Sequence, residues 1–300
     1  MTIQEAVTKK LKLFSRRKVV TLLSGNYDSL FRGRGLEIDT LREYVAGDDI
    51  KDIDWKATAR TGTAHTRLYA ALRDQRVVIL ADTSRSMLLD GYSKLNKQDA
   101  IYGVCVMLGA FVKRNQDLLA LCVSEPNGTV SVSRFNNTSR HIESVLRNID
   151  RSMHAPTNHN TGLDALGKQL LSSTKRRSAV FVVTDSVVDP KEFTAFIATL
   201  SRRHQVFYVQ LAPTWPFAPG YSDDVTFTDI ESGQTVSPDL AVSPKLQKEW
   251  RAQFDDWYKT TDKLCQARGI PHGLITDAND VPDVLRRMFI QAKQYAIRRK

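Results

Sequence analysis

Residues 76–86 read Arg-Val-Val-Ile-Leu-Ala-Asp-Thr-Ser-Arg-Ser, an apolar run that ends in a polar loop. A short apolar run rich in β-branched residues is typical of a buried strand in a parallel sheet. The loop after it places Asp82, Ser84 and Ser86 close together. Ligands of open α/β sheets bind beyond the carboxyl ends of the strands. The stretch therefore predicts a central strand with a polar site at its end.

Strand and helix patterns alternate through the rest of the chain. Strands are expected at 118–123, 129–133, 178–184, 205–211 and 271–275, and helices at 98–113, 139–149, 162–172, 190–203, 244–268 and from 281 onward. The first two of these strands should form a hairpin. Alternation of this kind predicts an α/β fold with a doubly wound, mostly parallel sheet flanked by helices, of the von Willebrand factor A or Rossmann-like type.

We divide the chain into an N-terminal extension, residues 1–75, and a main domain, residues 76–300. Glycines interrupt the extension, so strands and loops that pack on the main domain are expected there. Prolines break the rhythm of the main domain near 213–244, where we expect an inserted hairpin around Glu231-Ser232-Gly233.

We assign structural roles, and no metal site, to the charged and aromatic residues of the extension. Asp48 and its neighbouring aspartates are interpreted as a paired surface network with Arg42 and Arg60. Trp55 is interpreted as an anchor of the core.

Composition and cysteine content bound the class of protein. A hydrophobic content of 42% is enough for a substantial core. The apolar runs are far shorter than the ~20 residues of a membrane helix, and the N-terminus lacks a secretory signal pattern. Cys105, Cys122 and Cys265 are odd in number and widely spaced, and we interpret them as reduced, buried thiols. These features predict a cytoplasmic protein without a membrane span.

The net charge of +10 is concentrated at the two ends of the chain. Residues 1–18 hold six basic side chains against one acidic side chain, and residues 293–300 hold four basic and no acidic ones. The body between them is nearly neutral, whereas nucleic-acid binders usually concentrate charge on their folded surface. Nucleic acid is therefore not the expected partner. A scaffold that binds nucleic acid through basic termini is the alternative, and removing residues 1–18 should abolish such binding.

A second aspartate completes the predicted site. Asp185 follows the strand at 178–184, so its carboxylate should lie near that of Asp82. Hard cations prefer carboxylate and hydroxyl oxygens, which makes Mg²⁺ the expected ion and Mn²⁺ or Ca²⁺ the alternatives. Helix capping is the alternative explanation of Asp82, Ser84 and Ser86, and the second aspartate at the same edge favours the metal site over it. Aspartates that lie far apart, or that are already paired with lysine or arginine, would contradict an open metal site.

The pattern Asp82-x-Ser84-x-Ser86, followed by Thr184-Asp185, resembles the metal-ion-dependent adhesion site of von Willebrand factor A domains. This resemblance implies that the two serines bind the metal directly, and that the aspartates bind it directly or through water. It also implies a threonine ligand from an intervening loop.

The loop Pro156 to Gly162 offers two threonines for that ligand, and neither fits the family spacing cleanly. We assign Thr157 to the metal. Arg85, Thr161 and Ser186 are the residues that we expect to contact a partner.

A longer pattern lies upstream, and its segments are Gly33-Arg34-Gly35-Leu36-Glu37, Leu41-Arg42-Glu43-Tyr44, Gly47-Asp48-Asp49, Ile53-Asp54-Trp55 and Ala59-Arg60. This order is similar to domain-of-unknown-function family 58, bacterial proteins commonly encoded beside MoxR-type AAA+ ATPases. The resemblance covers roughly residues 30–290. It implies a non-catalytic adaptor or co-chaperone of such an ATPase and its clients, in which an acidic residue of the partner completes the metal shell. Many family members carry N-terminal transmembrane helices, which this chain lacks.

An enzymatic alternative is a phosphotransferase of the haloacid dehalogenase type, which also begins with an aspartate at a strand end. That chemistry needs a second aspartate two positions later, where this chain has Ser84. The sequence also lacks a Gly-x-Ser-x-Gly elbow and a Walker-type glycine loop. We therefore expect a protein that is not an enzyme.

Overall fold

The computed structural model describes residues 38–69, 74–89, 95–155, 162–213, 227–228, 235–236 and 244–298. A six-stranded sheet forms its centre, with the strand order β10-β7-β6-β3-β4-β5. Its strands are β3 (Arg76–Ala81), β4 (Leu118–Ser124), β5 (Val130–Val132), β6 (Ala179–Thr184), β7 (Gln205–Leu211) and β10 (His272–Ile275). All neighbours pair in parallel except the edge strand β5, which is antiparallel to β4.

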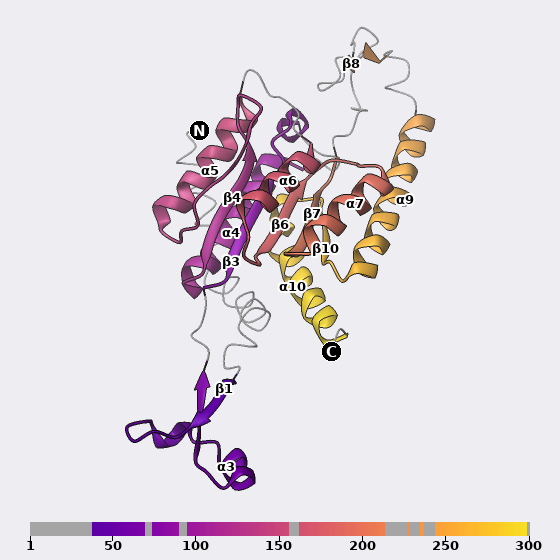
Figure 1. Cartoon of the computed structure of the whole chain (residues 1–300). Helices are drawn as coiled ribbons and strands as arrows, with labels where there is room; N and C mark the ends of the chain where they lie inside the picture. The colour runs from indigo at the N-terminus through magenta and orange to yellow at the C-terminus, as the bar shows by residue number, and fades with distance from the viewer. Residues whose placement is uncertain are drawn as a thin grey trace.

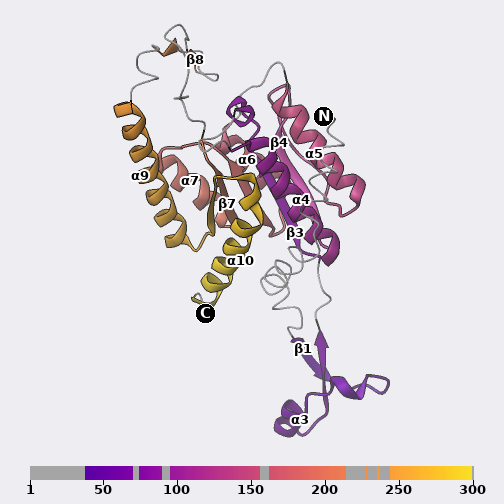
Figure 2. The same cartoon turned by 180° about the vertical axis from the view of Figure 1, so that it is seen from behind.

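Helices cover both faces of this sheet (Figures 1 and 2). They are α4 (Lys97–Asn115), α5 (Ser139–Met153), α6 (Leu163–Ser173), α7 (Pro190–Ser201), α9 (Pro244–Arg268) and α10 (Val281–Arg298). The apolar side chains of α4, α5 and α10 share one core cluster, and those of α6, α7 and α9 share another. The predicted doubly wound α/β fold is therefore confirmed.

Alternation along β3 explains how one strand supplies two cores. Val77 and Ile79 belong to the cluster under α4, whereas Val78 and Leu80 belong to the cluster under α6 and α7. Successive side chains of a strand point to opposite faces, so a run that is apolar at every position suits a strand covered on both sides. Burying each of these side chains contributes about 1.5–3 kcal/mol.

Aromatic side chains fill the core beneath α10. The rings of Phe181 and Phe207 stack with their centroids 4.4 Å apart, and Phe289 meets both edge-on. Gly273 lets this helix approach β10, since a Cβ there would lie 2.6 Å from Val284. The final strand and helix are thereby fixed to the sheet.

Part of the N-terminal extension forms a small separate unit. It contains β1 (Ile38–Glu43), the short 3-10 helix η1 (Ile50–Asp52), α3 (Trp55–Thr61) and β2 (His65–Tyr69), with the two strands antiparallel. Both views place this unit clear of the six-stranded sheet (Figures 1 and 2). Hydrogen bonds within the unit and a small buried centre around Ile53 and Ala57 hold it together. Residues 1–37 and 70–73 of the extension lie outside the described residues, so packing of the extension on the main domain stays a prediction.

Polar contacts within this unit follow the prediction in part. Asp48 pairs with Arg42 at 2.6 Å. The pKa of the Asp48 carboxyl is lowered, mainly by the hydrogen bond from the backbone N–H of Val45 and also by the charge of Arg42. Asp54 caps α3. The interpretation of Trp55 as a core anchor was wrong, because its side chain is 64% exposed. The buried residue of this short helix is Ala57, and Trp55 lies on another side of it.

The remaining predictions concern the inserted hairpin and the cysteines. β8 (Phe227–Thr228) and β9 (Thr235–Val236) form an antiparallel pair, as expected for a hairpin, and Glu231 lies outside the described residues. Cys105, Cys122 and Cys265 are buried and free. Burial raises the pKa of the Cys122 thiol to about 12. Among the described helices, none combines the length and the hydropathy that crossing a membrane would require.

Candidate functional site

The candidate site lies where β3 and β6 end at the same edge of the sheet. The two strands pair in parallel, with Ala81 opposite Val183. The N–H of Asp82 donates a hydrogen bond to the Val183 carbonyl at 2.9 Å, which extends the pairing by one residue. Asp82 and Asp185 are consequently brought to one place, as the sequence predicts.

The carboxylate of Asp82 is buried and accepts three hydrogen bonds. Its Oδ1 accepts from the backbone N–H of Ser84 at 3.0 Å. Its Oδ2 accepts from the hydroxyls of Thr184 at 2.6 Å and Ser186 at 2.9 Å. With only 8% of the residue exposed, these donors replace most of the hydration that the charge loses.

The two serines of the loop connect the aspartates, because the backbone N–H of Ser84 reaches Asp82 and the hydroxyl of Ser86 reaches Asp185. Ser84 Oγ lies 2.9 Å from Ser86 Oγ, and Ser86 Oγ donates to Asp185 Oδ1 at 3.0 Å. The 3-10 helix η2 (Arg85–Leu88) turns the chain here, so that both hydroxyls face the strand ends. The loop thus gathers four oxygen-bearing side chains, those of Asp82, Ser84, Ser86 and Asp185.

A lysine that the sequence analysis did not consider also reaches this place. Lys97 Nζ donates to Asp185 Oδ2 at 2.5 Å and to the backbone carbonyl of Ser86 at 2.9 Å. The residue is only 1% exposed. Burial raises the pKa of Asp185; the Lys97 ammonium opposes this change and the neighbouring Asp82 charge adds to it. The expectation of an open site was therefore wrong for Asp185, which is already paired with a lysine.

The donor set suits a hard divalent cation by type. Asp82, Ser84, Ser86 and Asp185 provide two carboxylates and two hydroxyls, and such cations prefer oxygen ligands. Within the part of the chain that the structure describes, no group of three or more His, Cys, Asp and Glu side chains could hold a metal ion. Hydroxyls must therefore contribute to any such site, and the ammonium of Lys97 already occupies one oxygen of Asp185.

The structure places the other predicted site residues as follows. Thr157 and Thr161 lie outside the described residues. Arg85 is exposed at this edge. Ser186 is half-buried and its hydroxyl donates to Asp82, and its contact with a partner stays a prediction. Thr184, which belongs to the motif but was not predicted as a metal ligand, donates to that same carboxylate.

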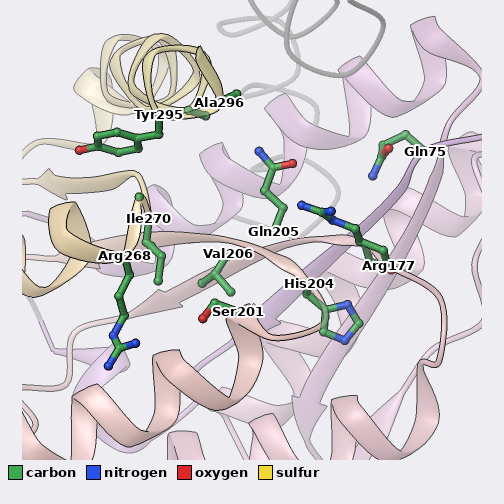
Figure 3. A pocket seen from close by; sticks show the side chains of 13 residues that line it. Gln75, Arg177, Ser201, His204, Gln205, Val206, Arg268, Ile270, Tyr295 and Ala296 are labelled. Carbon is green, nitrogen blue, oxygen red and sulfur yellow. The ribbon is translucent and has the colours of Figure 1, made fainter. Parts of the chain in front are cut away.

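The opposite edge of the sheet carries a second feature that the sequence analysis missed (Figure 3). A groove of about 510 Å³ opens near the amino ends of β6 and β7, and its lining includes Gln75, Arg177, His204, Gln205, Arg268 and Tyr295. Arg177 and Arg268 stand on opposite sides of it. Helices α7 and α9 end here, at Ser201 and Arg268. Basic side chains are favoured near the negative ends of helix dipoles, which explains the arginines without a ligand.

His204 is the unusual member of that groove. It is 2% exposed, and neither ring nitrogen has a hydrogen-bond partner among the described residues. Burial, with the charges of Arg203 and Arg177, lowers the pKa of His204 to about 4. The imidazole is therefore neutral at pH 7. Its signal in the sequence was weak, because a lone histidine between a helix and a strand has no distinctive spacing.

The chain matches uncharacterized relatives and aligns with several solved structures. It is 24% identical over 283 residues to an uncharacterized protein of Mycobacterium tuberculosis and to one of Mycobacterium bovis, covering 94% of this chain and 87% of each relative. Among solved structures, an aerotolerance-related membrane protein of Bacteroides fragilis aligns with a TM-score of 0.42 at 14% identity, over 72% of this chain and 99% of that one. The PilB minor pilin of Streptococcus sanguinis aligns with a TM-score of 0.35 at 12% identity, over 78% and 64%.

A family model matches a long part of this sequence and not only the residues of the candidate site. The model described as "Protein of unknown function DUF58" matches residues 40–260, which include most of the unit with β1 and β2, both aspartates of the site and Lys97. This range is more than half of the chain. The chain therefore belongs to the DUF58 family of proteins of unknown function.

Proposed function

We propose that this chain is a non-catalytic protein–protein interaction module of the von Willebrand factor A type. In this proposal a divalent cation binds at the carboxyl edge of the sheet and takes an acidic group of a partner as a further ligand. Mg²⁺ is the expected ion. The observation that carries the proposal is the convergence of Ser84 and Ser86 between Asp82 and Asp185. Because Asp185 is paired with Lys97, the proposal requires the ion to displace that ammonium. Oxygen atoms from two separate strand ends meet there, as a hard cation requires.

The chemistry of these side chains supports binding over catalysis. A cation held largely by neutral hydroxyls keeps much of its positive charge, and a carboxylate from outside is a favourable further ligand. Neither Ser84 nor Ser86 hydrogen-bonds to a histidine of the described chain, so neither has the general base of an activated nucleophile. Ser84 also stands where a phosphotransferase of the haloacid dehalogenase type needs its second aspartate.

The partner in this proposal is a MoxR-type AAA+ ATPase, together with its client proteins. Membership of the DUF58 family supports this choice through the family resemblance alone. We further infer that the complex forms in the cytoplasm, since the three cysteines are buried as free thiols.

The test is recovery of the ATPase on the immobilised full chain, with Mg²⁺ or with EDTA. Asp82→Ala and Ser84→Ala should reduce recovery in Mg²⁺ at least tenfold, to the level of the wild type in EDTA. Asp255→Ala is the matched control, because it removes an exposed carboxylate from α9 and should leave recovery unchanged. Equal recovery by all proteins in both buffers would refute the cation-dependent interaction.

A further inference from the structure

We propose that Lys97 competes with a divalent cation for Asp185 and thereby sets the cation affinity of the site. This inference rests on the proposed function, because it concerns the cation of the same site. It assigns a role to a residue outside the Asp-x-Ser-x-Ser motif, and it predicts that binding of the ion displaces the lysine ammonium.

The burial of Lys97 is the first observation behind this inference. Lysine is almost never fully buried unless it is paired, and Lys97 is 1% exposed. Its ammonium is compensated by one oxygen of Asp185, at 2.5 Å, and by the carbonyl of Ser86. Both of these groups belong to the loop and strand end that would surround the ion.

The position of Lys97 in its helix is the second observation. It is the first residue of α4, directly after the N-cap Asn96, whose side chain accepts from the N–H of Asp99. A positive charge in the first turn is disfavoured, since the helix N-terminus is itself positive. The local sequence would therefore favour an acidic residue at this position, and what stabilises the lysine is its contact with the site.

The charges explain why the two cations exclude each other. Asp82 and Asp185 supply two negative charges, and Lys97 neutralises one of them. A dication added beside the ammonium would leave the group with a net positive charge, and the two cations would repel one another at short range inside the protein. Displacing the ammonium leaves the carboxylates and the ion in balance. Removing the charge of Lys97 should therefore strengthen cation binding.

Mn²⁺ binding to the full chain tests this directly, with free Mn²⁺ measured by electron paramagnetic resonance. We expect Lys97→Met to lower the Mn²⁺ dissociation constant at least about tenfold relative to the wild type. Lys113→Met is the matched control, since Lys113 lies on the same helix, is exposed and contacts Ser139. It should bind Mn²⁺ as the wild type does.

A second measurement uses the wild-type protein and does not depend on the folding of a variant. Lysine acetylation by a small amine-reactive ester, read residue by residue by mass spectrometry, reports how accessible each ammonium is. Mg²⁺ should accelerate acetylation of Lys97 severalfold, because the displaced ammonium reaches solvent, and should not change acetylation of Lys113.

The outcomes separate this inference from the proposed function. Equal Mn²⁺ affinity of wild type and Lys97→Met, with no effect of Mg²⁺ on Lys97 acetylation, would overturn the competition and leave a cation-dependent partner interaction standing. Tighter binding by Lys97→Met, together with partner recovery that ignores EDTA, would support the competition and refute the proposed function. Failure of both proteins to bind Mn²⁺ at millimolar concentrations would overturn both.

Discussion

The two edges of the central sheet carry charges of opposite sign: aspartates lie at the carboxyl edge and arginines at the amino edge. At the carboxyl end, two buried aspartates accept hydrogen bonds from separate hydroxyls, and a buried ammonium pairs with Asp185. At the amino end, arginines stand beside the last residues of helices, and the buried imidazole of His204 has no hydrogen-bond partner among the described residues. The direction of the helices accounts for much of this difference, because parallel α/β folds place helix N-termini at one edge and C-termini at the other. Lys97 is an exception, because it is a buried cation at the positive end.

The largest change in stability is expected when the ion pair between Lys97 and Asp185 is broken. Lys97→Met should lower the free energy of unfolding by about 3–5 kcal/mol, because it leaves the buried Asp185 without its counter-charge. Urea denaturation followed by circular dichroism measures this loss. Combining the change with Asp185→Asn should restore most of the stability. A loss well below 1 kcal/mol in the single variant would show that the pair is not desolvated as described.

A smaller effect is expected at the other aspartate. Asp82→Asn should lower the free energy of unfolding by about 2 kcal/mol, since an amide cannot accept hydrogen bonds on both atoms from Ser84, Thr184 and Ser186. Urea denaturation again provides the measurement, with Asp255→Asn as the exposed control. Equal stability of the two variants would mean that the Asp82 network contributes nothing.

The amino end should instead make the protein sensitive to acid. The folded His204 has its pKa lowered to about 4, whereas in the unfolded chain it titrates near the ordinary value of about 6.5. As the pH falls below ~6.5, only the unfolded state takes up the proton, so stability falls. Between pH 7 and pH 5 this should remove about 1–2 kcal/mol from the free energy of unfolding. His204→Asn should lack this share of the pH dependence, and an unchanged pH profile would contradict it.

The smallest effect is expected from the arginine beside that histidine. Arg177→Ala should change the free energy of unfolding at pH 7 by no more than about 0.5 kcal/mol, because the side chain is exposed. Since Arg177 is among the charges that lower the pKa of His204, the variant should also lose slightly less stability between pH 7 and pH 5 than the wild type does. If the free energy of unfolding at pH 7 falls by much more than about 0.5 kcal/mol, Arg177 makes a stabilising contact, as the charges at the carboxyl end do.

Most of the main domain could be predicted from the sequence because its signals are local and agree with each other. The run from Val77 to Ala81 is apolar on both faces, and α4 has the apolar spacing of a helix. Parallel pairing then determines which loops share an edge, so the meeting of Asp82 and Asp185 followed from topology. Trp55 was predicted wrongly, because apolar character alone does not show which face of a short helix packs against anything.

The pairing of Lys97 with Asp185 at the carboxyl edge could not be predicted in the same way. A lysine at the start of a helix is usually a solvated charge, and its partner Asp185 lies 88 positions away in the sequence. The one available signal was its place in the first turn of α4, where the helix dipole disfavours it. Residues that oppose local preference tend to occur at functional sites. The helix was predicted to begin one residue later, so this conflict was not visible.

Trp257 gives the carboxyl edge an optical signal of its own. The indole N–H of this α9 residue donates a hydrogen bond of 2.7 Å to the carbonyl of Val188, three residues after Asp185 on the same loop. Indole emission depends on hydrogen bonding and on contact with water, so a shift of that loop would alter the fluorescence spectrum. Events around Asp185 can therefore be followed in the unlabelled protein, with Trp257→Phe identifying the contribution of this residue among the four tryptophans.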